Sequence, residues 1–379
     1  MSTIIHSARL VDGEVIDDAW VCFDDGQVAR SGTGETWLGL IADEIVDAGG
    51  AYLAPGFIDL HGHGGAGVSY DDGPDAVLRA RDLHRAHGTT RAVISLVTAP
   101  LDTLAARAAM VAELTEVHPD ILGSHLEGPF LDPDHRGAHD PQLLTVPAPD
   151  AVARLLEAGR GTVRQVTIAP ELPGGPAAIG RIVDAGAAAA VGHTSADFAM
   201  AAAAFDAGAT ILTHAFNAMP GLHHRRPGPV AAAAADSRVT LEVIADGVHL
   251  HPEIVRLAFS IAPGRIALIT DAMAAAGAAD GHYRLGALGV EVDRGVARLA
   301  DGGAIAGSTL TQDAALRAAV AAGVPLADAV DALTRAPAHA LGRDDLGALR
   351  PGCRADAVLL SPDLQVERVW CDGRPVSRR

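Results

Sequence analysis

The stretch Pro55-Gly56-Phe57-Ile58-Asp59-Leu60-His61-Gly62-His63-Gly64 decides how the rest of the chain is interpreted. An apolar run leads into it, and it closes with two histidines that are separated by one glycine. Residues two apart on a β-strand project to the same side, so His61 and His63 point toward one place. Two imidazoles at one point indicate a metal site; the alternative is a strand end whose histidines only form hydrogen bonds.

Further apolar runs follow, and alanine-rich, helix-like sequence separates each from the next. Together with the first run they span residues 56–61, 91–96, 121–127, 166–170, 188–193, 210–214, 240–245 and 266–271. This alternation is typical of βα units around a parallel sheet. Eight such units predict an α/β fold, a closed (β/α)8 TIM barrel, whose reactive residues lie at the C-terminal ends of the strands.

Both ends of the chain carry short strand patterns divided by turn residues. Asp24-Asp25-Gly26 near one end and Asp372-Gly373 near the other are typical of hairpin turns. Neither piece alone could form a stable sheet. We therefore expect residues 1–52 and 346–379 to combine into one small β-sandwich domain, with residues 53–345 as the catalytic barrel domain.

The composition narrows the possible partners and location. The chain has 379 residues, a formal net charge of −18 and a pI near 5.3. Nucleic acids and anionic membranes are bound by clustered basic charge, so we expect neither as a partner. No apolar run approaches the ~20 residues of a membrane span, and we expect no signal peptide. Three widely separated cysteines fit a reduced cytoplasm.

Histidines and carboxylates follow the C-terminal ends of five of the predicted strands. They are His61, His63, Glu127, His193, His214 and Asp271. Side chains at this end of a barrel converge on its mouth, so this set predicts a site for one or two divalent ions, and the alternative is a polar mouth without metal. Zinc is the first choice, and iron, manganese or cobalt accept the same ligands. The sequence has no lysine, so a carboxylated lysine cannot bridge two ions and Glu127 is the candidate bridge.

Single members of this region have alternatives of their own. Asp271 is either a helix N-cap or the proton acceptor of a metal-assisted hydrolysis, and we favour the proton acceptor. His125 lies two residues before Glu127, and we expect it to support the site without binding metal. His84, His87 and His118 have no evident partner, so we expect them to be solvated.

The segment from Pro220 to Pro229 is too long and too charged for a simple connection. It contains Leu222-His223-His224-Arg225-Arg226 between prolines and glycines. Long loops with such residues commonly bind ligands, and we expect this one to do so.

Nine short motifs extend over nearly the whole chain. They are Pro55 to Gly64, His125-Leu126-Glu127-Gly128-Pro129-Phe130, Gly137-Ala138-His139, Gly192-His193-Thr194, Thr213-His214-Ala215-Phe216-Asn217-Ala218-Met219, Arg225-Arg226-Pro227-Gly228, Ala245-Asp246-Gly247-Val248-His249, Thr270-Asp271-Ala272-Met273 and Ala306-Gly307-Ser308. They resemble the amidohydrolase superfamily and, within it, the N-acetylglucosamine-6-phosphate deacetylase family. The first motif is general to the superfamily, whereas the second and the fifth are much more specific to the deacetylases.

The resemblance implies a role for each matching residue. Glu127, His193 and His214 would hold one metal, and His61, His63 and Glu127 a second. Asp271 would be the general acid and base. The substrate-binding residues would be His139 at the sugar or carbonyl, Asn217, Ala218, Arg225 and His249 at the phosphate, and Ala306 and Ser308 from the last motif.

The implied reaction is hydrolysis of N-acetylglucosamine 6-phosphate to glucosamine 6-phosphate and acetate. Alternatives are deacetylation of N-acetylgalactosamine 6-phosphate, hydrolysis of a cyclic amide or a deamination on the same barrel, and a non-catalytic binding subunit. The absence of lysine and the basic loop argue against the cyclic-amide and deaminating enzymes. In the resembled family a basic residue of a neighbouring subunit reaches the phosphate, so we also expect a homodimer.

Overall fold

The computed structural model describes residues 2–376, and the predicted barrel is confirmed in it. Eight strands form one parallel sheet in the order β15-β14-β13-β12-β11-β10-β9-β6. Their bounds are β6 (Phe57–Asp59), β9 (Thr89–Val97), β10 (Ile121–Glu127), β11 (Val163–Ile168), β12 (Ala188–Val191), β13 (Ile211–Leu212), β14 (Thr240–Val243) and β15 (Ile266–Leu268). Just beyond the last strand, the Asp271 N–H donates to the His61 carbonyl at 2.8 Å, so the two ends of the sheet meet.

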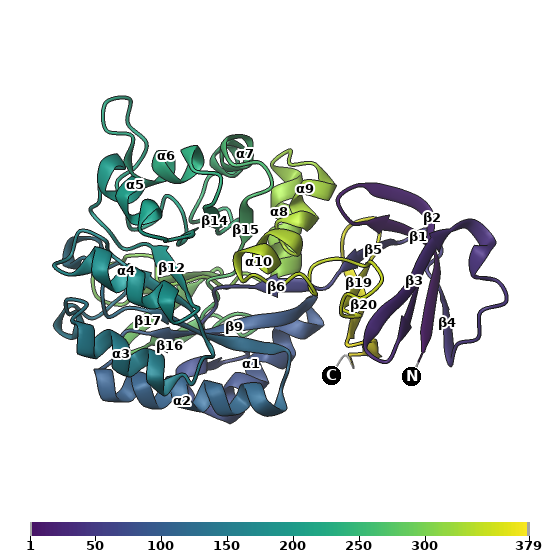
Figure 1. The fold of residues 1–379 in the computed structure, drawn as a ribbon, viewed down its shortest axis with the longest axis horizontal. Helices are drawn as coiled ribbons and strands as arrows, with labels where there is room; N and C mark the ends of the chain where they lie inside the picture. Colours follow the sequence, from purple (N-terminus) through teal and green to yellow (C-terminus); the bar gives the residue numbers. More distant parts are fainter. Residues whose placement is uncertain (1, 377–379) are drawn as a thin grey trace.

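Helices cover the outside of this sheet (Figure 1). They are α1 (Pro74–Ala86), α2 (Leu101–Val117), α3 (Pro149–Ala158), α4 (Gly175–Asp184), α5 (Phe198–Asp206), α6 (Gly228–Ala235), α7 (Pro252–Ile261), α8 (Gln312–Ala321), α9 (Leu326–Asp331) and α10 (Arg335–Ala340). Each of the longer helices buries one apolar stripe; in α4 that stripe is Ala178, Ile179 and Ile182. Among the described residues, no helix has both the length and the apolar character that crossing a membrane requires.

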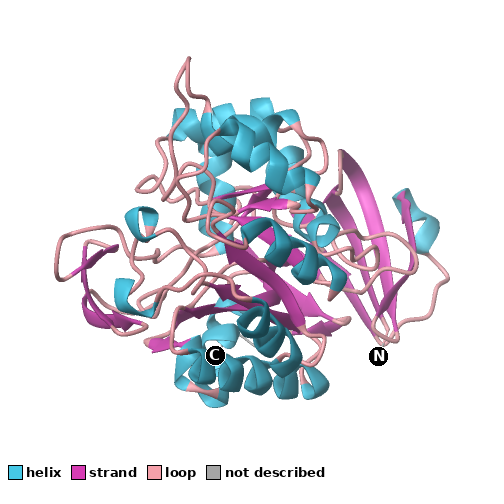
Figure 2. Cartoon of the chain, turned by 60° about the vertical axis from the view of Figure 1, so that its left-hand side comes forward, coloured by secondary structure: helices cyan, strands magenta, loops and turns pink. Residues whose placement is uncertain are grey.

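Strands from both ends of the chain form a second sheet beside the barrel (Figures 1 and 2). Its order is β21-β20-β19-β5-β1-β2-β3, and β4 pairs with β1. The bounds are β1 (Thr3–Val11), β2 (Val15–Asp24), β3 (Gln27–Thr33), β4 (Glu44–Asp47), β5 (Tyr52–Pro55), β19 (Ala357–Leu360), β20 (Val366–Cys371) and β21 (Arg374–Pro375).

This terminal sheet curls into the predicted sandwich. β2 and β20 are four strands apart, which in a flat sheet would be roughly 19 Å. However, the rings of Phe23 on β2 and Trp370 on β20 lie 6.4 Å apart, centre to centre, in an edge-to-face contact. The two ends of the sheet therefore face each other across one apolar core.

A small antiparallel sheet follows the last barrel strand. It consists of β16 (Gly281–Leu285), β17 (Leu288–Asp293) and β18 (Val296–Leu299). Its apolar face packs on Val97, Ala138 and Met273, which belong to loops and strand ends at the barrel mouth. A second short hairpin, β7 (Gly64–Gly65) with β8 (Val68–Ser69), follows the His61 to Gly64 stretch.

One buried arginine joins the barrel to the terminal sheet. Arg91 on β9 is 2% exposed and donates to both carboxylate oxygens of Asp356, at 2.6 and 3.0 Å, and also to Asp372. Asp356 and Asp372 belong to the C-terminal segment. A buried guanidinium is tolerated only when its charge is matched in this way, so the two domains are held together by a fixed ionic contact.

We predict that Arg91→Met lowers the free energy of unfolding by ~3–5 kcal/mol, because Asp356 is left buried without its counter-charge. Urea unfolding followed by circular dichroism measures the change. Arg154→Met is the matched control, since its pair with Asp102 is exposed (54% and 80%) and should contribute at most ~1 kcal/mol. Equal, small effects of both substitutions would show that the junction does not depend on Arg91.

Candidate metal-dependent active site

The carboxylate of Glu127, at the C-terminal end of β10, lies between two pairs of histidines. On one side, His61 Nε2 is 3.3 Å from Oε1 and His63 Nε2 is 3.0 Å from Oε2. On the other side, the Nε2 atoms of His193 and His214 are each 3.2 Å from Oε1. Glu127 is 4% exposed, so the structure brings all five side chains into one buried cluster.

Asp271 completes this cluster from the end of β15. Its Oδ1 atom is 3.3 Å from His63 Nε2 and 3.6 Å from His61 Nε2. All six residues that the sequence predicted as metal ligands are therefore within reach of one another, from the ends of five different strands.

Backbone conformation explains how three of these side chains reach the mouth. His193, His214 and Asp271 follow β12, β13 and β15, with φ of 47°, 27° and 47°. The left-handed region disfavours residues other than glycine, and its use at three strand ends stores strain that the surrounding structure must offset. The result is an abrupt end to each strand, with the side chain aimed into the barrel.

The electrostatics of the cluster are dominated by its two carboxylates. Burial would raise the pKa of Glu127 and Asp271, but the neighbouring imidazoles, His61 first, hold both pKa values well below their usual range. Burial would lower the pKa of His61 and His63, but the two carboxylates raise the pKa of His61 well above its usual value and that of His63 to about 9. The site therefore requires positive charge between these groups.

The donor set fits a divalent cation. The Nε2 atoms are 3.1 Å apart in the His61–His63 pair and 2.9 Å apart in the His193–His214 pair. Two imidazole nitrogens on one tetrahedral zinc ion are roughly 3.3 Å apart, close to both values. A cation bound beside His61 and His63 would also replace the protons that the carboxylates otherwise hold on these two histidines. His139, which the sequence did not suggest as a ligand, lies 3.6 Å from Glu127 Oε2 and forms a further ligand group with Glu127 and His193.

A cavity of about 350 Å³ opens beside the cluster. Of the predicted substrate-binding residues it includes His139, Asn217, Ala218 and His249, together with Asp271. Lining residues that sequence reasoning missed are Asp134, His135, Gly137, Ala138, Met219, Leu285, Ile305 and Gly307. Four of these, Gly137, Ala138, Met219 and Gly307, lie inside motifs already identified. Leu285 and Ile305 come from the β16–β18 region, where nothing in the sequence marks a ligand contact.

Three predicted substrate-binding residues do not line this cavity. Ser308 is 3% exposed and its hydroxyl donates to the Thr270 carbonyl, while its N–H donates to the Asp271 carbonyl, so it holds Asp271 in place. Ala306 is fully buried in the apolar contact beneath β16–β18. Gly307, between them, faces the cavity instead.

Arg225 is the third of these residues. It is exposed, and its Nε donates only to the neighbouring His224 ring at 3.0 Å. The loop that carries it projects beyond α5 and α6 (Figures 1 and 2). Arg225 therefore does not line the cavity in which a phosphate of the same subunit would lie.

Two expectations about other histidines had different outcomes. His125 makes contacts of 2.9 Å with Ser95 Oγ and 2.8 Å with Thr167 Oγ1, and so has no free nitrogen for a metal. The expectation that His84 is solvated is wrong. It is 3% exposed, and its Nε2 contacts the Gly64 carbonyl at 2.9 Å, because the β7–β8 hairpin covers this part of α1.

Comparisons with known proteins identify the family of the chain. A model of the amidohydrolase family matches residues 52–376. The chain belongs to this family. It is 44% identical to an N-acetyl-D-glucosamine-6-phosphate deacetylase mutant of Mycobacterium smegmatis, solved in complex with N-acetyl-D-glucosamine-6-phosphate, with a TM-score of 0.94 over 100% of both chains.

Two curated relatives differ in the sugar that their names carry. An N-acetylgalactosamine-6-phosphate deacetylase of Escherichia coli O157:H7 is 40% identical over the whole of both chains. An N-acetylglucosamine-6-phosphate deacetylase of Vibrio furnissii is 36% identical, over 90% of this chain and 87% of the relative.

Glu242 is a residue of this amidohydrolase that sequence reasoning missed. It is fully buried on β14, and its carboxylate accepts from Gln165 Nε2 at 2.8 Å and from the His214 N–H at 3.3 Å. His61 Nδ1 lies 3.2 Å from the same carboxylate. Because Glu242 can only accept, His61 must carry a proton on Nδ1, which leaves the Nε2 lone pair facing Glu127 when the ring is neutral.

We predict that Glu242→Gln lowers metal affinity ~10–100-fold. The NH2 group of the new side chain would face N–H donors of its neighbours, and the side chain would no longer fix the tautomer of His61. Competition with a chromophoric zinc chelator measures the affinity. Glu253→Gln, on the exposed surface of α7, should change nothing. Unaltered zinc affinity in a correctly folded Glu242→Gln protein would refute the role given to this carboxylate.

Proposed function

We propose that this amidohydrolase removes the acetyl group of N-acetylglucosamine 6-phosphate, giving glucosamine 6-phosphate and acetate. The observation that carries the proposal is the position of Asp271, which lines the cavity and also touches the Glu127-centred cluster of histidines. The Mycobacterium smegmatis relative, which was solved with this sugar phosphate, supports the choice of substrate.

The metal would be held by Glu127 with His193 and His214, and a second ion by Glu127 with His61 and His63. We propose zinc, since its preferred ligands are those present. When bound, such an ion lowers the pKa of a water molecule and polarises the amide carbonyl. The residues of the chain must then supply proton transfer and substrate orientation.

Asp271 would transfer the proton. Its pKa is held below the usual range, so it is ionised at neutral pH and can accept a proton from the attacking water. As the C–N bond of the acetamide breaks, the water oxygen remains on acetate and Asp271 returns the proton to the departing amine. Ser308 and Thr270 would position Asp271, through the backbone and hydroxyl contacts described above.

His139 would orient the acetamide. Burial lowers its pKa to about 4, despite the opposing effect of Glu127, so its ring is neutral at pH 7. Its Nδ1 contacts Thr98 Oγ1 at 2.8 Å, which leaves Nε2 at the cavity wall. A neutral imidazole placed there can donate a hydrogen bond to a substrate oxygen without adding charge.

The phosphate would be bound at the far wall of the cavity. Burial opposes the protonation of His249, but its 2.7 Å contact with Asp246 raises its pKa, so it can offer a charged donor near neutral pH. The Ala218 N–H donates to no described residue and is free for an oxygen of the ligand. The Asn217 N–H instead donates to the His214 carbonyl at 3.0 Å, and its side-chain Nδ2 donates to the His214 and Ala215 carbonyls at 3.1 and 3.3 Å, so Asn217 would reach the phosphate through a water molecule.

Arg225 would complete the phosphate site of a neighbouring subunit in a homodimer. It does not line its own cavity, and it lies on a loop that projects from the body (Figure 1). Exposed apolar side chains occur on this loop at Leu222 and on α5, which packs against α6, at Phe198 and Met200 (39–50% exposed), which suits a surface that a second copy covers.

We also propose the domain boundaries and the cellular location that the sequence predicts. The terminal segments 1–52 and 346–379 are the accessory domain, and residues 53–345 are the catalytic domain. The three cysteines are buried and unpaired, which supports a reducing, cytoplasmic location.

The second candidate substrate is N-acetylgalactosamine 6-phosphate, which the name of the Escherichia coli relative favours. Rates of acetate release from both sugar phosphates, and from unphosphorylated N-acetylglucosamine, show which of the two candidate substrates the enzyme prefers. We expect the highest kcat/KM with N-acetylglucosamine 6-phosphate. A clear preference for the galactosamine epimer would replace the proposed substrate, and no release from either sugar phosphate would overturn the proposed reaction.

Asp271→Asn should reduce kcat by ~10²–10⁴ while metal content stays close to that of the wild type, because an amide cannot accept the proton. A discontinuous assay of acetate release measures kcat, and elemental analysis measures the metal content. Asp102→Asn, on the exposed surface of α2, is the control. Turnover within a few-fold of wild type would exclude Asp271 as the proton carrier.

Arg225→Ala should lower kcat/KM for the phosphorylated substrate roughly ten- to a hundred-fold, equivalent to ~1.5–3 kcal/mol for one charged hydrogen bond. The weak activity on unphosphorylated N-acetylglucosamine should hardly change. Arg256→Ala, on the surface of α7, is the control. Equal losses on both sugars, or an active monomer in sedimentation at assay concentration, would contradict a phosphate contact across a dimer.

A further inference from the structure

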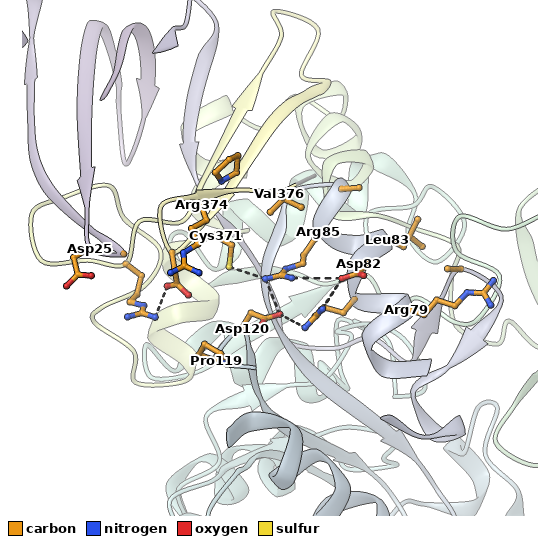
Figure 3. A pocket seen from close by; sticks show the side chains of 17 residues that line it. Asp25, Arg79, Asp82, Leu83, Arg85, Pro119, Asp120, Cys371, Arg374 and Val376 are labelled. Carbon is orange, nitrogen blue, oxygen red and sulfur yellow. Dashed lines mark hydrogen bonds and ion pairs between the residues drawn. The ribbon is translucent and has the colours of Figure 1, made fainter. Parts of the chain in front are cut away.

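A second cavity, of about 890 Å³, lies where the barrel meets the terminal sheet (Figure 3). Residues of α1 and of the loop before β10 form one side, and the β20–β21 hairpin with its neighbours forms the other. No residue that lines it also lines the catalytic cavity. Its volume is within the range of small-molecule sites.

Arginines are concentrated in this cavity, although the protein as a whole carries a net charge of −18. Five of its 17 lining residues are arginines: Arg79, Arg81, Arg85, Arg354 and Arg374. Four are aspartates: Asp25, Asp82, Asp120 and Asp372. The lining is therefore more positive than the rest of the surface, which is the condition for attracting an anion.

Arg85 has donors that the protein does not use. Its side chain is 21% exposed and makes one hydrogen bond, from Nη2 to the thiol of Cys371 at 3.5 Å. Its Nε is buried and has no partner. Asp82 and Asp120 are 4.0 and 3.6 Å away, so they supply charge but no hydrogen bond. A guanidinium in this state favours a ligand with oxygen acceptors.

The carboxylate of Asp120 lies near the guanidinium groups of both Arg81 and Arg85. Arg81 and Arg85 are one turn apart on α1, where like charges repel. Asp120 Oδ2 lies between them, at 3.5 and 3.6 Å, and it is buried without a hydrogen bond. Asp82 Oδ1 accepts a hydrogen bond from Arg81 Nη2 at 2.9 Å, so Arg81 has a close carboxylate partner, whereas Arg85 has no carboxylate within hydrogen-bonding distance.

Arg374 and Arg79 add unpaired charge on either side. Neither side chain makes a hydrogen bond or ion pair with any residue in the described part of the chain. Figure 3 shows Arg374 on the side of the terminal hairpin and Arg79 farther along α1, with Arg85 between.

We propose that this cavity is a second, non-catalytic binding site for a small phosphorylated molecule, held by Arg85 and Arg374. A phosphate monoester carries nearly two negative charges and three acceptor oxygens, which match several guanidinium forks better than a single carboxylate does. The rest of the cavity leaves room for the group that the phosphate esterifies.

Isothermal titration with glycerol 3-phosphate at fixed ionic strength tests the proposal. The titration uses Arg225→Ala protein, in which phosphate binding at the catalytic cavity is already weakened. Adding Arg374→Ala should weaken the remaining binding roughly tenfold or more, since Arg374 has no structural partner whose loss would disturb folding. Adding Arg294→Ala, a substitution on the exposed β17–β18 turn, is the matched control and should have no effect.

Two results would overturn the proposal. One is the absence of glycerol 3-phosphate binding to the Arg225→Ala protein. The other is binding that Arg374→Ala leaves unchanged. The single Arg374→Ala variant should retain the full rate of acetate release, and a large loss would mean that the substitution disturbs the fold and that Arg374 does not serve this separate site.

Discussion

The buried carboxylate of Glu127 is the constraint on which the site depends. A carboxylate that is 4% exposed is costly unless positive charge surrounds it, and five imidazoles approach it. No single strand could supply them, because a strand end contributes one or two side chains. A closed barrel solves this problem by bringing the ends of β6, β10, β12, β13 and β15 to one place.

Much of the remaining structure keeps those strand ends in position. Asp59 accepts hydrogen bonds from Thr270 Oγ1 at 2.6 Å and from the His61 N–H at 3.2 Å, and so ties the first strand to the last. Glu242 fixes the His61 ring from below. Arg91 anchors the opposite, N-terminal side of the barrel to the terminal sheet. The left-handed conformations of His193, His214 and Asp271 can persist because these contacts offset their strain.

The sequence predicts those parts of the molecule that a short run of neighbouring residues is enough to identify. Eight strands, the His61–His63 pair and the residues at other strand ends could be found because each lies within a short apolar run that ends in a polar residue. Glu242 could not be found, since it resembles any glutamate in a strand and meets His61 only after a separation of 181 residues. His84 was misplaced because its helix pattern gives no hint of the hairpin above it. Ser308 and Arg225 show a different limit: a motif marks a residue as functional, but only the fold reveals which residues surround it and whether it lines the cavity.

The central claim is that Glu127 and the four histidines beside it hold the catalytic metal. X-ray diffraction from crystals of the purified protein, measured at the absorption edge of the metal found by elemental analysis, tests it most directly. The account predicts anomalous density ~2.0–2.2 Å from Glu127 and from the Nε2 atoms of His193 and His214, with any second ion bound by His61 and His63. Density that does not contact Glu127, or full activity in protein from which metal has been removed, would contradict the account.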